Sequence, residues 1–105
     1  MGLKVNVEVQ PEVTIFKLKG ILDISTNKVI DSYLNNLSNT KEVILDLSEL
    51  EFIDSTGIGS IINAIYMSQE EHFILKLTGV DESIQEVFET VGLYQILKTI
   101  QEVGI

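Results

Sequence analysis

One segment, residues 43–65, constrains the fold more than any other, because two different hydrophobic periodicities meet within it. Residues 43–47 (VILDL) are nearly all apolar, as expected for an interior strand that is covered on both faces. After a polar junction, apolar side chains return with the spacing of one helix face, at Ile58, Ile61, Ile62 and Ile65. An interior strand that leads directly into an amphipathic helix predicts an α/β domain.

The first part of the chain has the pattern of a β-hairpin. Residues 5–9 alternate between valine and polar side chains, which is typical of a half-buried strand. Pro11 lies in a plausible turn, and residues 13–19 (VTIFKLK) predict a second strand. We therefore expect an antiparallel hairpin over residues 4–19.

A helix is expected between this hairpin and the apolar strand. Ser25 or Thr26 is placed to cap it, since hydroxyls accept hydrogen bonds from the first N–H groups of a helix. Asn39 and Thr40 are expected to end it. Its apolar face has helical spacing and consists of Ile30, Tyr33, Leu34 and Leu37.

The C-terminal part predicts a strand and two more helical segments. Residues 73–78 (FILKLT) resemble a strand, and Asp81 is a good N-cap for the helix that follows. Gly92 is placed to stop that helix in a left-handed conformation. Residues 93–97 suggest one more helical turn, and residues 99–105 fit either a short edge strand or a loose tail.

These elements predict a single α/β domain over residues 1–105. The sheet is mixed and has four to five strands, because the initial hairpin is antiparallel while strands joined through helices are parallel. About four helices pack with this sheet.

Composition excludes several classes of function. The chain has no cysteine, which excludes disulfides, a thiolate nucleophile and Cys-ligated zinc. Its net charge is −9 and it contains no arginine, which argues against a nucleic-acid partner, because phosphate binding depends on Lys and Arg. No segment approaches the ~18 apolar residues of a membrane span. We therefore expect a cytoplasmic protein.

The sequence does not support an enzyme. Nucleophilic catalysis by Ser55 needs a general base, and the single histidine, His72, lies in a polar stretch typical of the surface. Glu49, Glu51 and Asp54 are close in sequence, but we interpret them as a solvated acidic loop. We expect no catalytic residue, no metal site and no cofactor.

Asp46 raises one alternative among α/β proteins. It lies near the end of an interior strand, where receiver domains of response regulators carry their phosphoacceptor aspartate. Those domains also need an acidic pair after their first strand to hold Mg²⁺. The corresponding strand here, VNVEVQ, has no such pair, which argues against this hypothesis.

The junction itself contains a carboxylate, two hydroxyls and two glycines. Asp54, Ser55 and Thr56 have an adequate structural explanation as caps for the first N–H groups of the helix. Gly57 and Gly59 fall in the first turn, where each costs up to ~1 kcal/mol relative to alanine. Because these glycines remove side chains beside the hydroxyls, they favour close approach by another chain.

The helix surface opposite the isoleucines has few charges. A solvated helix face usually carries more Lys and Glu, so a face of small or uncharged residues indicates a docking surface. The residues expected to contact a partner are Ser60, Asn63, Ala64, Tyr66 and Met67.

The central motif resembles the signature of STAS domains, specifically the bacterial anti-sigma factor antagonists. Residues 52–59 (FIDSTGIG) follow residues 43–48 (VILDLS), and this combination in a strand–helix context is fairly specific. Shorter matches to the family are residues 20–23 (GILD), 77–80 (LTGV) and 91–93 (VGL). The resemblance extends from residue 4 to about residue 98.

This resemblance implies a mechanism. In the family, the unphosphorylated antagonist binds an anti-sigma factor, which then releases its sigma factor. The anti-sigma factor is also an ATP-dependent serine kinase that phosphorylates the antagonist and weakens the complex, and a serine phosphatase resets the cycle. By resemblance, Ser55 is the phosphoacceptor and Thr56 is a second candidate. The flanking residues expected to position the site are Asp23, Asp54, Gly57 and Gly59.

The resemblance leaves one alternative open. STAS domains also occur as parts of transporters and lipid-trafficking complexes, where they act as constitutive protein-interaction modules. Some of those domains lack the phosphorylatable serine, which this chain retains at position 55. The anti-sigma factor antagonist is therefore the preferred hypothesis.

Overall fold

The computed structural model describes residues 2–37 and 40–103 of the chain. Within these residues it contains four strands and four helices, which confirms the predicted α/β class. In chain order the elements are β1 (Leu3–Gln10), β2 (Val13–Leu22), α1 (Asn27–Asn35), β3 (Glu42–Ile53), α2 (Ser55–Glu70), β4 (Ile74–Thr78), α3 (Glu82–Thr90) and α4 (Leu93–Val103).

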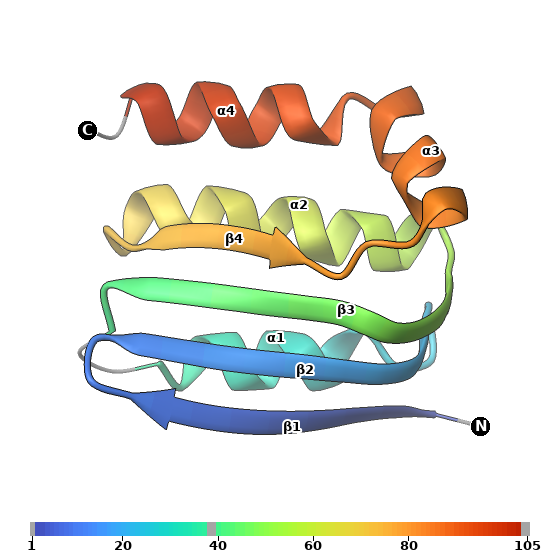
Figure 1. Cartoon of the computed structure of the whole chain (residues 1–105), viewed down its shortest axis with the longest axis horizontal. Coiled ribbons are helices and arrows are strands. Elements are labelled where there is room, and N and C mark those ends of the chain that lie inside the picture. The colour runs from blue at the N-terminus through green and yellow to red at the C-terminus, as the bar shows by residue number, and fades with distance from the viewer. Residues whose placement is uncertain (1, 38–39, 104–105) are drawn as a thin grey trace.

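The four strands form one mixed sheet in the order β1-β2-β3-β4. β1 and β2 are antiparallel, whereas β2/β3 and β3/β4 are parallel, as predicted. Both crossovers step in the same direction across the sheet, so right-handed connections place α1 and α2 on the same face. Figure 1 shows these two helices behind the sheet, with α4 running beside α2.

The core lies between the sheet and the helices. β3 is an interior strand of the sheet, but the helices of the described residues cover only one of its faces, so the prediction of cover on both faces is wrong. On the other face, Ile44 and Asp46 are half-buried, because neighbouring strands shield them. The largest fully buried side chains include Phe16, Leu18, Leu45, Ile61, Ile65, Leu75 and Phe88.

Local capping follows the sequence in some places and not in others. Asp81 caps α3 by accepting a hydrogen bond from the Ile84 N–H at 2.9 Å, and Gly92 has φ 73°, both as predicted. Thr26 occupies the N-cap position of α1, but its side chain makes no capping bond. α1 ends at Asn35, earlier than expected, and the predicted stop at Asn39 lies outside the described residues.

β3 is longer than its apolar run, because two bulges allow it to continue to Ile53. The pairing with β2 shifts after Asp46 and again after Leu50, which adds one unpaired residue to β3 each time. Glu49 and Glu51 therefore lie on the exposed side of a strand, and the prediction of an acidic loop is wrong for both.

The C-terminal segment is helical as far as Val103. This excludes an edge strand or a loose tail for residues 99–103. The helix is stable because its apolar side chains pack against the core, which completes the cover of α2. The packed residues are Tyr94, Ile96, Leu97 and Ile100.

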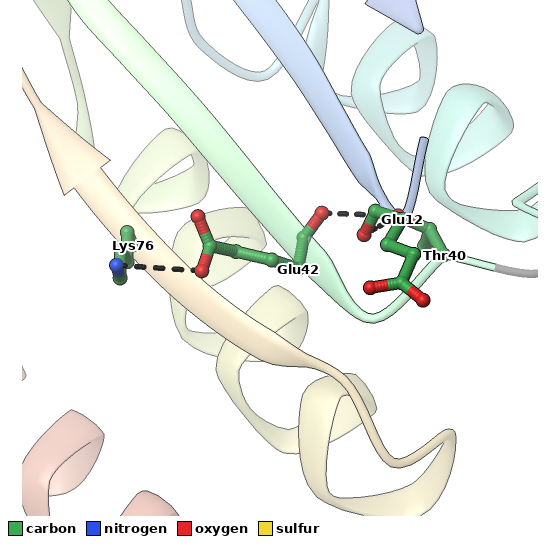
Figure 2. A network of polar contacts seen from close by, with 4 residues as sticks. All are labelled: Glu12, Thr40, Glu42 and Lys76. Atoms are coloured by element: carbon green, nitrogen blue, oxygen red, sulfur yellow. Dashed lines mark hydrogen bonds and ion pairs between the residues drawn. The ribbon is translucent and has the colours of Figure 1, made fainter. Parts of the chain in front are cut away.

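A polar network closes the end of the sheet that lies far from the strand–helix junction. The Glu12 carbonyl accepts hydrogen bonds from the backbone N–H groups of Lys41 and Glu42, at 2.8 and 3.0 Å. The Glu42 carboxylate pairs with Lys76 across β3 and β4 at 3.3 Å, and Thr40 lies beside Glu12 (Figure 2). These contacts join the first hairpin to the start of β3.

Candidate functional site

Asp54 organises the junction between β3 and α2. Its Oδ1 accepts a hydrogen bond from the Gly57 N–H at 2.8 Å, which makes Asp54 the N-cap of α2. Its Oδ2 accepts a second hydrogen bond from the Ile24 N–H at 3.3 Å. The same carboxylate therefore holds the start of α2 and the loop that follows β2.

Asp23 shapes that loop from within. Its Oδ1 accepts hydrogen bonds from the Ser25 hydroxyl at 2.6 Å and from the Ser25 N–H at 2.9 Å. The bond from the Ser25 hydroxyl is the main reason why the pKa of Asp23 lies below its usual value of 3.8. The Thr26 hydroxyl donates to the Ile21 carbonyl at 2.8 Å and accepts from the Asp23 N–H at 2.9 Å. Asp23 thus rigidifies the loop beside the junction.

The two predicted phosphoacceptors differ in accessibility. Ser55 is the first residue of α2 and is exposed, whereas Thr56 is half-buried. Among the described residues, neither hydroxyl has a hydrogen-bond partner. Because Asp54 already caps the helix, the cap explanation does not account for a hydroxyl at position 55.

The two glycines of the motif differ in what a side chain at each position would contact. A Cβ at position 57 would lie 2.3 Å from the Leu22 carbonyl oxygen and 2.8 Å from Cγ1 of Ile53. Gly57 is therefore required so that α2 can approach the end of β2, and the prediction that it opens the surface to another chain is wrong. A Cβ at position 59 would have nothing within 4 Å. Gly59 is exposed one turn after Ser55, and internal packing gives no reason for it.

The predicted partner-contacting face divides into two parts. Asn63 and Tyr66 are exposed, but Ser60 and Ala64 are buried, so the latter two cannot contact a partner and their prediction is wrong. The reason is that α2 packs against α1, α4 and the sheet, and small side chains let neighbouring elements approach closely. Met67 is half-buried and lines a surface pocket toward α1.

Two apolar residues near Ser55 were missed by the sequence interpretation. Ile24 is 76% exposed in the loop that Asp54 holds, and Phe52 is 53% exposed near the end of β3. Phe52 points outward because the second bulge reverses the alternation of the strand. An isolated isoleucine in the polar run DISTN was the only available signal for Ile24.

Several other kinds of site find no support in the described part of the chain. There, no three His, Asp or Glu side chains gather in a way that could hold a metal ion. His72 is exposed in the turn before β4. No helix in residues 2–37 and 40–103 combines the length and the apolar character needed to cross a bilayer.

Comparison with known proteins decides the family. The STAS domain profile matches residues 4–104, which include all of the elements described above except Leu3, the first residue of β1. The chain belongs to the STAS domain family. One STAS relative, the anti-sigma-B factor antagonist of Staphylococcus aureus strain NCTC 8325 / PS 47, is 24% identical over 99 residues, which cover 92% of each chain. The anti-sigma F factor antagonist of Paenibacillus polymyxa is 23% identical over 100 residues, covering 92% of this chain and 86% of that protein.

Solved structures share the STAS fold. A putative anti-sigma factor antagonist from Thermotoga maritima aligns with a TM-score of 0.78 and 22% identity, covering 89% of this chain and 82% of that one. A sulfate transporter family protein from Wolinella succinogenes aligns with a TM-score of 0.77 and 22% identity, covering 86% and 75%. The anti-sigma factor antagonist SpoIIAA in its unphosphorylated form aligns with a TM-score of 0.70 and 20% identity, covering 82% of each chain. At these identities the similarity establishes the fold alone.

Proposed function

We propose that this STAS domain is an anti-sigma factor antagonist that is switched by phosphorylation of Ser55. The unphosphorylated form binds an anti-sigma factor that is also a serine kinase, so that a sigma factor is freed. The kinase transfers the γ-phosphoryl group of ATP to the Ser55 oxygen, and the complex dissociates. A serine phosphatase then restores the hydroxyl. The names of the curated relatives support the general role.

The exposed hydroxyl of Ser55 carries this proposal. It begins α2 with no partner among the described residues, and Gly59 leaves the surface one turn away without a side chain. A kinase active site needs such access, because the phosphoryl group must arrive in line with the serine oxygen. Thr56 is less suited as the acceptor, since it is half-buried.

The surrounding surface is suited to a protein partner. Ile24 and Phe52 are exposed apolar side chains at the end of the molecule that carries Ser55, and exposed Asn63 and Tyr66 extend the surface along α2. Large apolar and aromatic anchors dominate the energetics of protein interfaces. Tyr66 also lines an open groove of about 370 Å³ with Val91, which follows α3, and with the α4 residues Gln95, Ile96, Thr99 and Ile100. Docking along this surface would bring the partner over Ser55.

Phosphorylation is expected to act on binding and not on folding. The backbone N–H groups of Ser55 and Thr56 have no acceptor among the described residues, so a phosphate at this helix start finds donors and the favourable end of the dipole. For the complex with the partner, the phosphate is unfavourable. Complex formation would bury a group of charge about −1.5 to −2 beside the Asp54 carboxylate, and desolvating such a charge without matched cations costs several kcal/mol.

A second candidate remains from the sequence, and a solved structure that shares the fold is named a sulfate transporter family protein. In this alternative the chain is a constitutive interaction module of a transporter or lipid-trafficking complex. Such a module has no need for a free Ser55 hydroxyl, so its binding should be indifferent to modification there. The two candidates therefore differ in one measurable property.

The test is a pull-down from the source cell with four proteins: wild type, Ser55→Ala, Ser55→Asp and a matched control, Ser32→Asp. Ser32 is an exposed serine on α1, so its replacement adds the same charge away from the junction. We expect wild type, Ser55→Ala and Ser32→Asp to capture an anti-sigma kinase that Ser55→Asp loses. Equal capture by Ser55→Asp would favour the constitutive module. A phosphate found on Thr56 of the Ser55→Ala protein would identify Thr56 as the acceptor instead.

A further inference from the structure

The free edge of β1 presents a complete row of backbone groups. Among the described strands, β1 has one neighbour, β2, and Figure 1 shows it at the outer edge of the sheet. The Ile21 N–H donates to the Gly2 carbonyl at 3.2 Å, which makes Gly2 and Ile21 a hydrogen-bonded pair. In an antiparallel ladder such pairs recur every second residue. The even-numbered residues of β1 therefore bond to β2, and the odd-numbered ones direct their N–H and C=O groups outward.

This edge has few of the features that normally protect one. β1 pairs with β2 in continuous register from Leu3 to Gln10, with no bulge and no proline. Natural edges are usually blunted by bulges, prolines, short strands, covering segments or charged side chains, and of these devices β1 has charged side chains, Lys4 and Glu8. An eight-residue edge without a bulge is instead a template for another strand.

The inner face of β1 is also uncovered. Val7 is 43% exposed and Val9 is 75% exposed, although both lie on the face that packs against helices elsewhere in the sheet. They border a pocket of about 240 Å³ between the hairpin and α1, which Phe16 and Tyr33 also line. Within residues 2–37 and 40–103, α1 reaches this pocket but leaves Val9, at the end of the hairpin, 75% exposed.

The outer face carries an unbalanced charge. Lys4 lies directly opposite Lys19 in the β1/β2 ladder, and like charges in such positions destabilise a sheet. Neither lysine has an ion-pair partner within residues 2–37 and 40–103, although the chain as a whole has a net charge of −9. Glu8 lies on the same face of β1, four residues further along, where it accepts a hydrogen bond from Gln10.

We propose that two copies of this chain associate through antiparallel pairing of their β1 strands, with Asn6 of each copy at the two-fold axis. Lys4 then faces Glu8 of the partner subunit, and the ion pair occurs twice by symmetry. On the inner face, Val5 faces Val7 of the partner subunit and Leu3 faces Val9 of the partner subunit. The outward N–H and C=O groups of the odd-numbered residues supply the hydrogen bonds.

Only this register pairs the opposite charges and also keeps inner-face side chains opposite inner-face side chains. A shift by one residue would place inner-face side chains opposite outer-face ones. A shift by two residues pairs Lys4 with Asn6 or Gln10 of the partner subunit and loses both ion pairs. A shift by four residues places Lys4 opposite Lys4 of the partner subunit, or Glu8 opposite Glu8 of the partner subunit, and these like charges repel. The ion pairs fall at non-hydrogen-bonded positions, where cross-strand side chains approach most closely.

This dimer is independent of the proposed switch. β1 and α4 lie at opposite edges of the molecule in Figure 1, so pairing through β1 leaves the groove beside Tyr66 open in each copy. A dimer therefore presents two docking surfaces.

The experiment is sedimentation velocity on the full chain from about 1 μM to about 1 mM. The variants are Lys4→Glu, Glu8→Lys and a matched control, Lys98→Glu, which makes the same charge change on exposed α4. Replacing two attractive pairs by two repulsive ones should raise the dimer Kd about tenfold or more for Lys4→Glu and for Glu8→Lys. Lys98→Glu should dimerise as the wild type does.

Mixing the two β1 variants gives the sharpest result. A Lys4→Glu copy and a Glu8→Lys copy restore both ion pairs between unlike chains. The mixture should therefore form a heterodimer at concentrations at which each variant by itself stays monomeric. Val7→Pro removes an outward N–H without touching the β2 ladder and should also abolish association. Circular dichroism confirms that each variant is folded. A wild type that stays monomeric at about 1 mM, or a mixture without heterodimer, would overturn the proposal.

Discussion

Replacing each motif glycine by alanine separates packing from docking at the junction. The Gly57→Ala methyl group would lie 2.3 Å from the Leu22 carbonyl oxygen and 2.8 Å from Cγ1 of Ile53. Ordinary contacts are about 3.5 Å, so the helix start must move by about 1 Å. That movement also stretches the hydrogen bond from the Asp54 N–H to the Leu22 carbonyl, already 3.3 Å long. Overpacking of this kind costs about 1–3 kcal/mol.

Gly59→Ala provides the matched comparison on the same helix. Its methyl group enters open space, so helix propensity should raise stability by about 0.5–1 kcal/mol. Urea unfolding measures the free energy of unfolding of each variant. We expect Gly57→Ala to lie below wild type and Gly59→Ala above it, so that the two variants differ by about 1.5–4 kcal/mol. If Gly57→Ala unfolds within about 0.5 kcal/mol of wild type, the packing argument is refuted. If Gly59 is part of the docking surface, Gly59→Ala should also bind the anti-sigma partner more weakly.

Three further predictions concern the carboxylates and metal ions. Asp54→Ala should lower the free energy of unfolding by about 1–2 kcal/mol, because it removes the N-cap, whereas Ser55→Ala should change it by less than about 0.5 kcal/mol; urea midpoints compare them. Hydrogen bonds from the Ser25 hydroxyl, the Ser48 N–H and the Ile84 N–H are the main causes that hold the pKa values of Asp23, Asp46 and Asp81 below 3.8. Because the folded-state pKa values of these carboxylates are depressed, the stability that they contribute is present above pH 3.8 and is lost as the pH falls below it. An acid titration followed by circular dichroism should therefore show unfolding below pH 3.8. Replacement of these aspartates by asparagine should make the loss of stability with falling pH shallower. EDTA should leave the thermal midpoint unchanged, and a clear fall would reveal a carboxylate metal site.

The order of the elements could be predicted because each has a local signal. Alternation in the first hairpin, the apolar run at the start of β3 and the Asp81 cap all depend on residues close in sequence. The bulges in β3 depend instead on how the strand pairs with β2, a partner at least 20 residues away. For that reason the exposure of Phe52 and the strand positions of Glu49 and Glu51 were not predictable.

The site was predictable in its motif and less so in its surface. Asp54, Ser55 and Thr56 are all good capping residues, and which of them caps depends on the residue at which α2 begins. Small side chains are equally compatible with solvent and with close packing, so hydropathy could not show that Ser60 and Ala64 are buried. Only the arrangement of α1, α4 and the sheet around α2 decides that question.

The measurement that tests the central claim most directly is the affinity of the anti-sigma partner for the Ser55-phosphorylated and unmodified proteins, together with amide exchange of α2. We expect phosphorylation to weaken binding about a hundredfold, corresponding to ~3 kcal/mol, while the exchange rates of α2 stay the same. The label should be a phosphoserine ester that survives acid, since an acyl phosphate on Asp46 would hydrolyse. Equal affinity of the two forms, or loss of protection across α2, would contradict a switch that acts by local electrostatics at the docking surface.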